Sequence, residues 1–149
     1  MKRSAGILMY RFQGGELQVL LVHPGGPFFA RRDAGAWSIP KGEFSDEDPL
    51  EAARREFHEE TGFAAEGDFV PLSPCRQKGG KVVHAWALEG DLDVTQVRSN
   101  TFELGPGRRY PEIDRAEWFP LAEAARRINA AQVVWLEELR RKLAGRPAQ

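Results

Sequence analysis

The chain has 149 residues, of which 42% are hydrophobic and 29% are charged, and its formal net charge is -1 at pH 7. These values are typical of one globular domain that buries a substantial core. Because the net charge is close to zero, no overall positive field attracts a nucleic acid or an anionic membrane, and a polyanionic ligand would need a local site. We expect a single domain over residues 1–149, with a frayed tail after about residue 144, and no nucleic acid as partner.

The cysteine content and the hydropathy of the chain further restrict the class of protein. Cys75 is the only cysteine, which excludes an internal disulfide and a zinc site built on several thiolates. The N-terminal residues lack the apolar run and cleavage site of a signal peptide, and no segment approaches the ~20 apolar residues of a membrane span. We therefore expect a cytoplasmic protein that does not enter a membrane. The sequence carries no signal for an oligomeric state.

The first part of the chain is expected to contain a β-hairpin. The elements predicted there are strands over 4–12, 17–23 and 37–39, and a loop over 24–35. Gly14 and Gly15 favour a tight turn between the first two strands. Pro40 should end the third.

A helix over residues 49–61 is the best-marked element. Asp48 suits the N-cap, Pro49 suits the first helical position, and Glu51 completes a capping box. Gly62 suits the left-handed position that follows a helix.

The remaining elements are predicted from composition and periodicity. They are strands over 69–76, 81–88 and 116–119, an irregular stretch over 91–111, and amphipathic helices over 120–129 and 131–143. The order of strands, helix, strands and helices favours an α/β fold in which helices pack on a mixed sheet.

Three glutamates of the 49–61 helix fall on one stripe beside its apolar face: Glu56, Glu59 and Glu60. A like-charge pair four residues apart, such as Glu56 and Glu60, destabilises an isolated helix by roughly 0.2–0.5 kcal/mol. All three also lie toward the helix C-terminus, where the helix dipole disfavours anions. A divalent cation such as Mg²⁺ would account for this arrangement, and Arg55 could hold a carboxylate ionised. From the helix alone, the alternative is a solvated face on which Arg55 forms salt bridges with Glu51 and Glu59.

The same helix carries a longer pattern. Residues 55–63, Arg-Glu-Phe-His-Glu-Glu-Thr-Gly-Phe, match the core of the Nudix box: Arg, Glu, an apolar residue, any residue, Glu, Glu, any residue, Gly and an apolar residue. Glu47 stands where the box has a glutamate, with seven residues between it and Arg55, and Gly42 stands near its leading glycine. The chain therefore resembles the Nudix hydrolase family.

The resemblance continues on both sides of this segment. Residues 37–43 look like the strand and turn that precede the box, and residues 118–124 look like the closing strand and helix. The similarity covers about residues 4–143. It implies the Nudix α/β/α sandwich with a mixed β-sheet.

The chain departs from the box at one point. Four residues, rather than five, separate Gly42 from Glu47, so the loop over 43–46 is one residue short. In the family a backbone carbonyl near the leading glycine binds the metal, and here that carbonyl belongs to Gly42 or to Lys41. Because the helix is intact, we do not expect a loss of activity.

The resemblance implies a role for each matching residue of the box. Glu56, Glu59 and Glu60 should bind Mg²⁺, with Mn²⁺ as the alternative ion, and Glu56 is a candidate for the general base. Arg55 should orient the carboxylates. Glu47 either supports the metal site or only stabilises the start of the helix.

Residues outside the box are expected to complete the site. Family members often recruit a further carboxylate, for which Glu103, Glu112 and Glu117 are candidates, and we favour Glu112 because the segment before Trp118 could fold over the site. Lys41 is placed to bind phosphates, and Tyr110 could stack on a base. For each, the alternative is an ordinary surface or packing role.

The box identifies the bond that is cleaved, a phosphoanhydride in a nucleoside-diphosphate-linked substrate. The residues around the box look most like family members that cut dinucleoside polyphosphates, so we expect a diadenosine polyphosphate or a nucleoside triphosphate. The alternatives are pyrophosphate removal from the 5′ end of RNA, a Nudix module that senses a nucleotide without cleaving it, and an interaction protein that uses the 131–143 helix.

Overall fold

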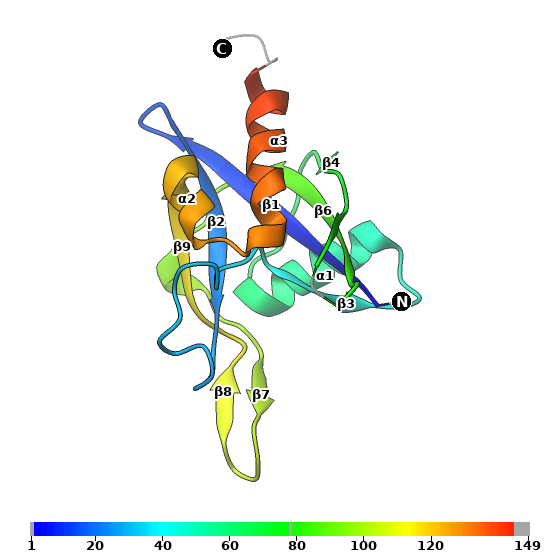
Figure 1. The fold of residues 1–149 in the computed structure, drawn as a ribbon, viewed down its shortest axis with the longest axis vertical. Coiled ribbons are helices and arrows are strands. Elements are labelled where there is room, and N and C mark those ends of the chain that lie inside the picture. The colour runs from blue at the N-terminus through cyan, green and yellow to red at the C-terminus, as the bar shows by residue number, and fades with distance from the viewer. Residues whose placement is uncertain (1, 78, 145–149) are drawn as a thin grey trace.

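The computed structural model describes residues 2–77 and 79–144 (Figure 1). Its strands are β1 (Arg3–Gln13), β2 (Glu16–Pro24), β3 (Lys41–Phe44), β4 (Val70–Pro71), β5 (Cys75–Arg76), β6 (Val82–Glu89), β7 (Thr101–Glu103), β8 (Arg109–Pro111) and β9 (Ile113–Pro120). Its helices are α1 (Pro49–Thr61), α2 (Leu121–Arg127) and α3 (Val133–Ala144), with short 3₁₀ turns η1 (Val94–Gln96) and η2 (Ala130–Gln132). The predicted frayed tail lies outside the described residues.

A mixed sheet is built around β1. Its strand order is β4-β6-β1-β2-β9, with β3 paired to β1 and β5 paired to β6. β1 runs parallel to β6 and antiparallel to β2 and β3. Because β6 accompanies one edge of β1 along its length, β2 and β3 share the other edge, β2 at the C-terminal end of β1 and β3 at its N-terminal end. The predicted mixed sheet is confirmed.

Helices cover both faces of the sheet, as Figure 1 shows for α1 on one side and α3 on the other. Side chains of β1 alternate between the two layers: Ile7 joins the core beneath α1, and Leu8 joins the core beneath α2 and α3. Since β1 is buried on both faces, its sequence is a continuous apolar run. The predicted α/β/α sandwich is confirmed. Within the described residues, no helix is both long and apolar enough to cross a membrane.

At the ends of α1, Asp48 and Gly62 act as their sequence signals predicted, whereas the Glu51 carboxylate accepts from Arg54 at 3.5 Å. The Asp48 carboxylate accepts hydrogen bonds from the amides of Leu50 and Glu51, at 3.1 and 3.2 Å. Gly62 adopts φ 83° and its amide donates to His58 O. These caps fix α1 as a rigid element from Pro49 to Thr61.

The segment around Pro40 differs from its prediction. Residues 37–39 form only isolated bridges with Val22 and Ile128, and the strand begins after Pro40 rather than ending there. Although proline has no amide donor, its carbonyl accepts from the Ile7 amide at 3.1 Å, so the chain joins β1 at this point and β3 follows.

Other boundaries differ in the second half. The single strand predicted over 69–76 is two short strands, β4 and β5, because Pro71 and Pro74 supply no amide to a ladder. The stretch predicted as irregular contains η1 and the β7–β8 hairpin, whose turn contains Gly105 and Gly107 at positive φ. The hairpin projects from the body of the molecule (Figure 1). Both C-terminal helices start later than predicted, at Leu121 and Val133.

Candidate active site

Strand β3 lies against α1 with almost no space between them. A Cβ placed on Gly42 would come within 1.9 Å of Glu56 Oε1, so only glycine allows the carboxylate to approach this backbone. Glu56 is 9% exposed, and burial raises its pKa, with the charge of Glu59 adding to the effect. The sequence placed Gly42 and Glu56 in one site, and the structure brings them into contact.

Arg55 connects three carboxylates. Its guanidinium donates two hydrogen bonds to Glu47, from Nη2 to Oε1 at 2.7 Å and from Nε to Oε2 at 2.8 Å. Nη1 donates to Glu56 Oε2 at 2.6 Å and to Glu59 Oε2 at 3.0 Å. These bonds, those to Glu47 first, hold the pKa of Arg55 above its usual range and hold that of Glu47 below it. Arg55 therefore fixes the orientation of the carboxylates on this side of α1.

The carboxylate of Glu60, a residue of α1, lies against the start of β3. Its Oε1 accepts a hydrogen bond from the Lys41 amide at 3.2 Å. Burial raises the pKa of Glu60 to about 8, and the charges of Glu56 and Glu112 act in the same direction. Carboxyl groups crowded in this way are stabilised in their ionised form by a nearby cation.

Glu112 reaches the same place from the segment that follows the β7–β8 hairpin. A cleft of about 150 Å³ contains Glu112, Glu60 and Lys41 among its walls. The backbone of Glu112 is held on both sides, by Gly25 N donating to its carbonyl and by its own amide donating to Asn100 O, each at 2.8 Å. Burial, followed by the charge of Glu59, raises the pKa of the Glu112 carboxyl.

Other sequence candidates do not line this cleft. Tyr110 lies on β8, where its ring packs 6.0 Å from that of Phe102 and its hydroxyl accepts from Arg108. Glu103 is exposed on β7, and Glu117 is exposed on β9. Glu112 is thus the one of the three proposed outer carboxylates that the structure brings to Glu60.

Sequence reasoning missed two residues that organise the cleft. Ser38 is part of its wall. Asn100 connects α1 to Glu112, because its amide donates to Glu59 O at 3.0 Å while its carbonyl accepts from Glu112. Ser38 had a weak signal, its place in the segment that precedes the box. Asn100 had none, because it lies in a stretch that the sequence predicted only as irregular.

The donors around the cleft suit a hard divalent cation, because carboxylate and carbonyl oxygens are the ligands that Mg²⁺ and Mn²⁺ prefer. Within residues 2–77 and 79–144, no three His, Cys, Asp or Glu side chains are already gathered tightly enough to bind an ion. Arg55 is hydrogen-bonded to Glu56 and Glu59, and the Lys41 amide is hydrogen-bonded to Glu60. The raised pKa values of Glu56 and Glu60 are the feature that fits a cation.

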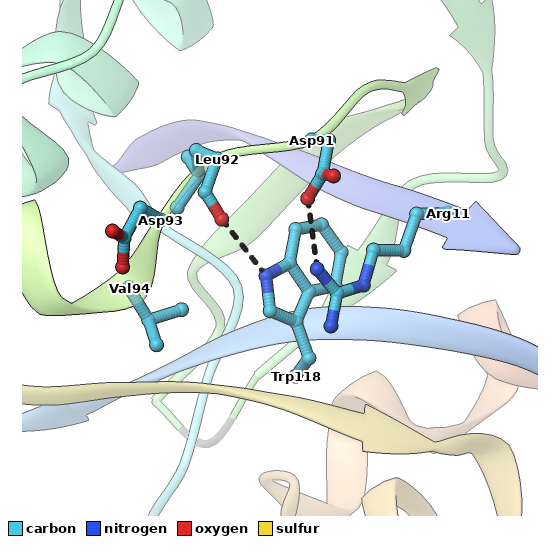
Figure 2. Close-up of a pocket in the computed structure, with 6 residues that line it drawn as sticks. All are labelled: Arg11, Asp91, Leu92, Asp93, Val94 and Trp118. Atoms are coloured by element: carbon cyan, nitrogen blue, oxygen red, sulfur yellow. Dashed lines mark hydrogen bonds and ion pairs between the residues drawn. The ribbon is translucent and has the colours of Figure 1, made fainter. Parts of the chain in front are cut away.

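A second concave surface, of about 430 Å³, lies at the opposite end of β1, roughly 20 Å along the strand from β3 (Figure 2). There the Arg11 guanidinium covers the ring of Trp118 and pairs with Asp91 at 2.8 Å. The Trp118 indole donates to Leu92 O at 3.2 Å. Since these polar groups satisfy one another, this surface fastens the chain after β6 to the sheet and is not the main candidate for catalysis.

Comparison with known proteins identifies the fold and the family. The NUDIX domain model matches residues 1–139. The structure resembles an Ap4A hydrolase of C. elegans solved as a binary complex, with a TM-score of 0.70 and 24% identity, covering 98% of this chain and 100% of that chain. It also resembles the NUDIX domain of Shewanella oneidensis NrtR complexed with ADP ribose, with a TM-score of 0.65 and 17% identity, covering 95% of this chain and 87% of that chain. At these identities the likeness establishes the fold alone.

One curated relative matches in sequence. An RNA pyrophosphohydrolase of Bartonella henselae is 36% identical over 66 residues, which are 41% of this chain and 35% of that protein. This match therefore spans about a third of the relative's length. Because the family model spans nearly all of the sequence, the chain belongs to the NUDIX domain family.

Proposed function

We propose that this NUDIX protein hydrolyses a phosphoanhydride bond in a nucleoside-diphosphate-linked substrate, with Mg²⁺ as its ion and Mn²⁺ as the alternative. The proposed substrate is a diadenosine polyphosphate or a nucleoside triphosphate. The observation that carries the proposal is the crowding of carboxylates with raised pKa values, Glu56, Glu60 and Glu112, at one end of α1. Their pKa values fit a site that is completed by a cation.

The proposed ligands are the carboxylates of Glu56, Glu59 and Glu60, with a backbone carbonyl from Gly42 or Lys41. A divalent ion held there would neutralise charge on the substrate phosphates and make the attacking water more acidic. Glu112, which lines the same cleft, would add a further carboxylate.

Side chains of the protein would carry out the other tasks, which are orienting the base, accepting a proton and binding phosphate. Arg55, bonded to Glu47, Glu56 and Glu59, would keep Glu56 oriented to accept a proton from the attacking water. Glu112 is the alternative base, because its raised pKa brings the carboxyl closer to neutrality. Lys41, a wall residue of the cleft, would bind a substrate phosphate as a compact point charge. Tyr110 lies outside the cleft, so it would have to contact the nucleobase of the substrate from the β7–β8 hairpin.

The 5′ end of RNA is the second candidate substrate, favoured by the sequence match to an RNA pyrophosphohydrolase. The same carboxylates would act on it, because the anhydride bond is of the same kind. RNA binding also requires a basic path for the chain, which the net charge of -1 does not favour. A module that only senses a nucleotide is the third candidate, and the complete set of box carboxylates argues against it. The cytoplasmic location stays a prediction.

The deciding experiment is product analysis by chromatography after incubation of the pure protein with Mg²⁺. The substrates are diadenosine tetraphosphate, ordinary and oxidised nucleoside triphosphates, nucleotide sugars and 5′-triphosphate RNA. The double variant Glu59→Gln, Glu60→Gln is measured in parallel, together with Glu16→Gln as a charge-matched control in the distant β1–β2 hairpin.

We expect turnover of one nucleotide class that is abolished in the double variant and retained in Glu16→Gln. Turnover of the RNA alone would select the second candidate. If the protein binds nucleotides but turns over no substrate with either Mg²⁺ or Mn²⁺, the nucleotide-sensing module would be favoured over the hydrolase.

A further inference from the structure

Gln132 is a polar side chain enclosed in the core, at the point where the chain enters α3. It is 0% exposed and ends the η2 turn, directly before α3 begins at Val133. Burying an amide group costs free energy unless its oxygen and its nitrogen are hydrogen-bonded. The partners of Gln132 therefore indicate what the residue does.

The side-chain amide of Gln132 is bonded to the segment that precedes β3. Its Oε1 accepts a hydrogen bond from the Ile39 amide at 3.1 Å. Its Nε2 donates to Ser38 Oγ at 3.0 Å and to the Oε1 of Gln77, which follows β5, at 3.2 Å. Ser38 Oγ in turn donates to the Ile39 carbonyl at 2.8 Å. Two side chains thus hold both backbone polar groups of Ile39.

A side-chain amide fits this set of partners. The Ser38 hydroxyl hydrogen is directed at the Ile39 carbonyl, so Oγ is left to accept from Gln132. The Ile39 amide needs an acceptor, whereas Ser38 Oγ and Gln77 Oε1 need a donor. Because an ionised carboxylate offers no donor and an apolar chain offers neither group, the surroundings specify a glutamine at this position.

On one side, the segment before β3 is bonded to the mixed sheet. Ser38 exchanges two backbone hydrogen bonds with Val22 of β2, at 2.8 and 3.0 Å. The Pro40 carbonyl accepts from the Ile7 amide of β1 at 3.1 Å. Since the backbone polar groups of an extended chain point alternately to its two sides, the intervening Ile39 must find its partners on the other side.

That other side is formed by the chain that links α2 to α3. The Trp37 amide donates to Arg127 O at 3.0 Å, and the Trp37 carbonyl accepts from Asn129 N at 2.7 Å. At Ile39, the next residue that faces this way, the partner is the side chain of Gln132 instead of backbone. Gln132 therefore extends this row of hydrogen bonds to the point where the η2 turn replaces an extended backbone.

The segment that Gln132 holds leads directly into the carboxylate site. Ile39 lines the cleft that also contains Glu60. Two residues further along, the Lys41 amide donates to Glu60, and the glycine that follows lies against Glu56. Because the chain between Ile39 and these contacts is short, a displacement of Ile39 would move the backbone to which both carboxylates are fitted.

We propose that Gln132 is a positioning residue of the carboxylate site. By holding Ile39 from behind the cleft, it fixes the position at which the start of β3 meets Glu60 and Glu56. Gln132 acts through the backbone and not through contact with an ion or a substrate. The inference rests on the proposed function for the reaction that the site performs.

The test begins with Gln132→Met, which keeps the length of the side chain and removes its amide group. The Ile39 amide then loses its acceptor, so its hydrogen exchange, followed by NMR, should become at least about ten-fold faster. The Ser38 amide, which is bonded to Val22, should exchange as in the native protein. This readout shows whether the segment has been released without any use of substrate.

Two functional readouts follow for the same variant, with its folded fraction checked by circular dichroism. For the nucleotide that the native protein cleaves, kcat should fall by about ten-fold and KM should change by less than about two-fold, because alignment rather than binding is altered. The affinity for Mn²⁺ alone, measured by electron paramagnetic resonance, should weaken by about five-fold. A native kcat in Gln132→Met would overturn the proposal.

Two control variants separate positioning from loss of stability. Gln77→Met removes only the bond that leads away from the cleft wall. Leu139→Ala opens a cavity in the core beneath α3 and should lower the melting temperature at least as much as Gln132→Met. Both controls should keep kcat and Mn²⁺ affinity within about two-fold of the native values. Equal losses in Leu139→Ala and Gln132→Met would assign the effect to stability and overturn the proposal.

A second replacement, Gln132→Glu, decides the matter if Gln132→Met does not fold. A protonated carboxyl group reproduces the pattern of the amide, since its carbonyl oxygen accepts from Ile39 and its hydroxyl donates to Gln77. An ionised carboxylate faces the Gln77 oxygen without a hydrogen to share. The ratio of the variant kcat to the native kcat should therefore rise as the pH is lowered, and a ratio that is independent of pH would contradict the proposal.

The outcome is separable from that of the proposed function. If the native protein cleaves no nucleotide, but Gln132→Met weakens Mn²⁺ binding and the two controls do not, the positioning role stands and the hydrolase proposal fails. If Gln132→Met cleaves nucleotides as well as the native protein does, the positioning role fails alone.

Discussion

The two faces of strand β3 have opposite chemistry within one residue of each other. On the α1 face, Gly42 admits the carboxylate of Glu56, and acidic groups outnumber basic ones. On the other face, ammonium groups outnumber carboxylates, with Lys41 and Lys81 against Glu43. The acidic face is held together by hydrogen bonds from Arg55, whereas on the basic face the ammonium group of Lys41 and the hydroxyl of Ser4 have no hydrogen-bond partner among the described residues.

This difference shows how one short strand can separate two kinds of charge. Because successive side chains of a strand point to opposite faces, the four residues of β3 place the Glu56 carboxylate on one side and Lys41 and Glu43 on the other, without any loop between them.

The largest effect is expected when the acidic face is blocked by Gly42→Ala. The new methyl group would occupy the space of the Glu56 carboxylate, 1.9 Å from Oε1, and would force that side chain away from β3. Because the end of a glutamate is flexible, the fold should survive, while turnover should fall by about 100-fold or more. Steady-state kinetics and thermal melting measure the two effects, with Gly90→Ala as the control at a glycine that lies against the flexible Met9 side chain. Full activity in Gly42→Ala would show that close contact with β3 is unnecessary.

The next effect concerns stability against pH without metal. The pKa of Glu60 in the folded protein, about 8, lies above the ordinary glutamate value of about 4.5, so the folded state binds more protons between these values. Stability should therefore fall as pH rises from about 4.5 to about 8, by on the order of a few kcal/mol. Urea unfolding in EDTA across this range measures the slope, which should be smaller in Glu60→Gln. Adding Mg²⁺ should reduce the slope of the native protein, because a cation favours the ionised carboxylate. A slope that is equal in both proteins would contradict the burial of Glu60 as its cause.

Much more of the acidic face than of the basic face could be predicted from the sequence. Residues 49–61 carry their own caps, periodicity and charge spacing, so the helix and the grouping of Glu56, Glu59 and Glu60 follow from local rules. The resemblance to the Nudix box placed Gly42 and Glu56 in the same site, and the structure adds their direct contact.

The basic face depends on strand register, which local sequence does not encode. Ser4, Glu43 and Lys81 are far apart in the chain and become neighbours only because β3 and β6 pair with the same end of β1. Register follows from the whole buried pattern of a sheet, so a polar residue at one edge gives no signal of its own. The β7–β8 hairpin was missed for a related reason, because its three-residue strands are too short for a periodicity to be seen.

A smaller effect is expected when the organising cation of the acidic face is weakened by Arg55→Lys. A lysine cannot reproduce the paired hydrogen bonds to Glu47 while also reaching Glu56. We expect kcat to fall by about ten-fold with little change in KM, since orientation rather than binding is altered. Arg54→Lys on the neighbouring position, where the guanidinium contacts the Ala65 carbonyl, is the control. A rise in KM at constant kcat would instead assign Arg55 to substrate binding.

The smallest effect should come from the ion pair on the basic face. Glu43 and Lys81 have side chains that are 53% and 26% exposed, so water screens their attraction. A double-mutant cycle with Glu43→Gln and Lys81→Met, measured by urea unfolding, should give a coupling energy of about 0.2–1 kcal/mol. A weak pair is expected because both side chains remain in contact with water. A coupling energy of several kcal/mol would mean that the pair is a structural clamp, and the contrast between the two faces of β3 would then be one of charge alone.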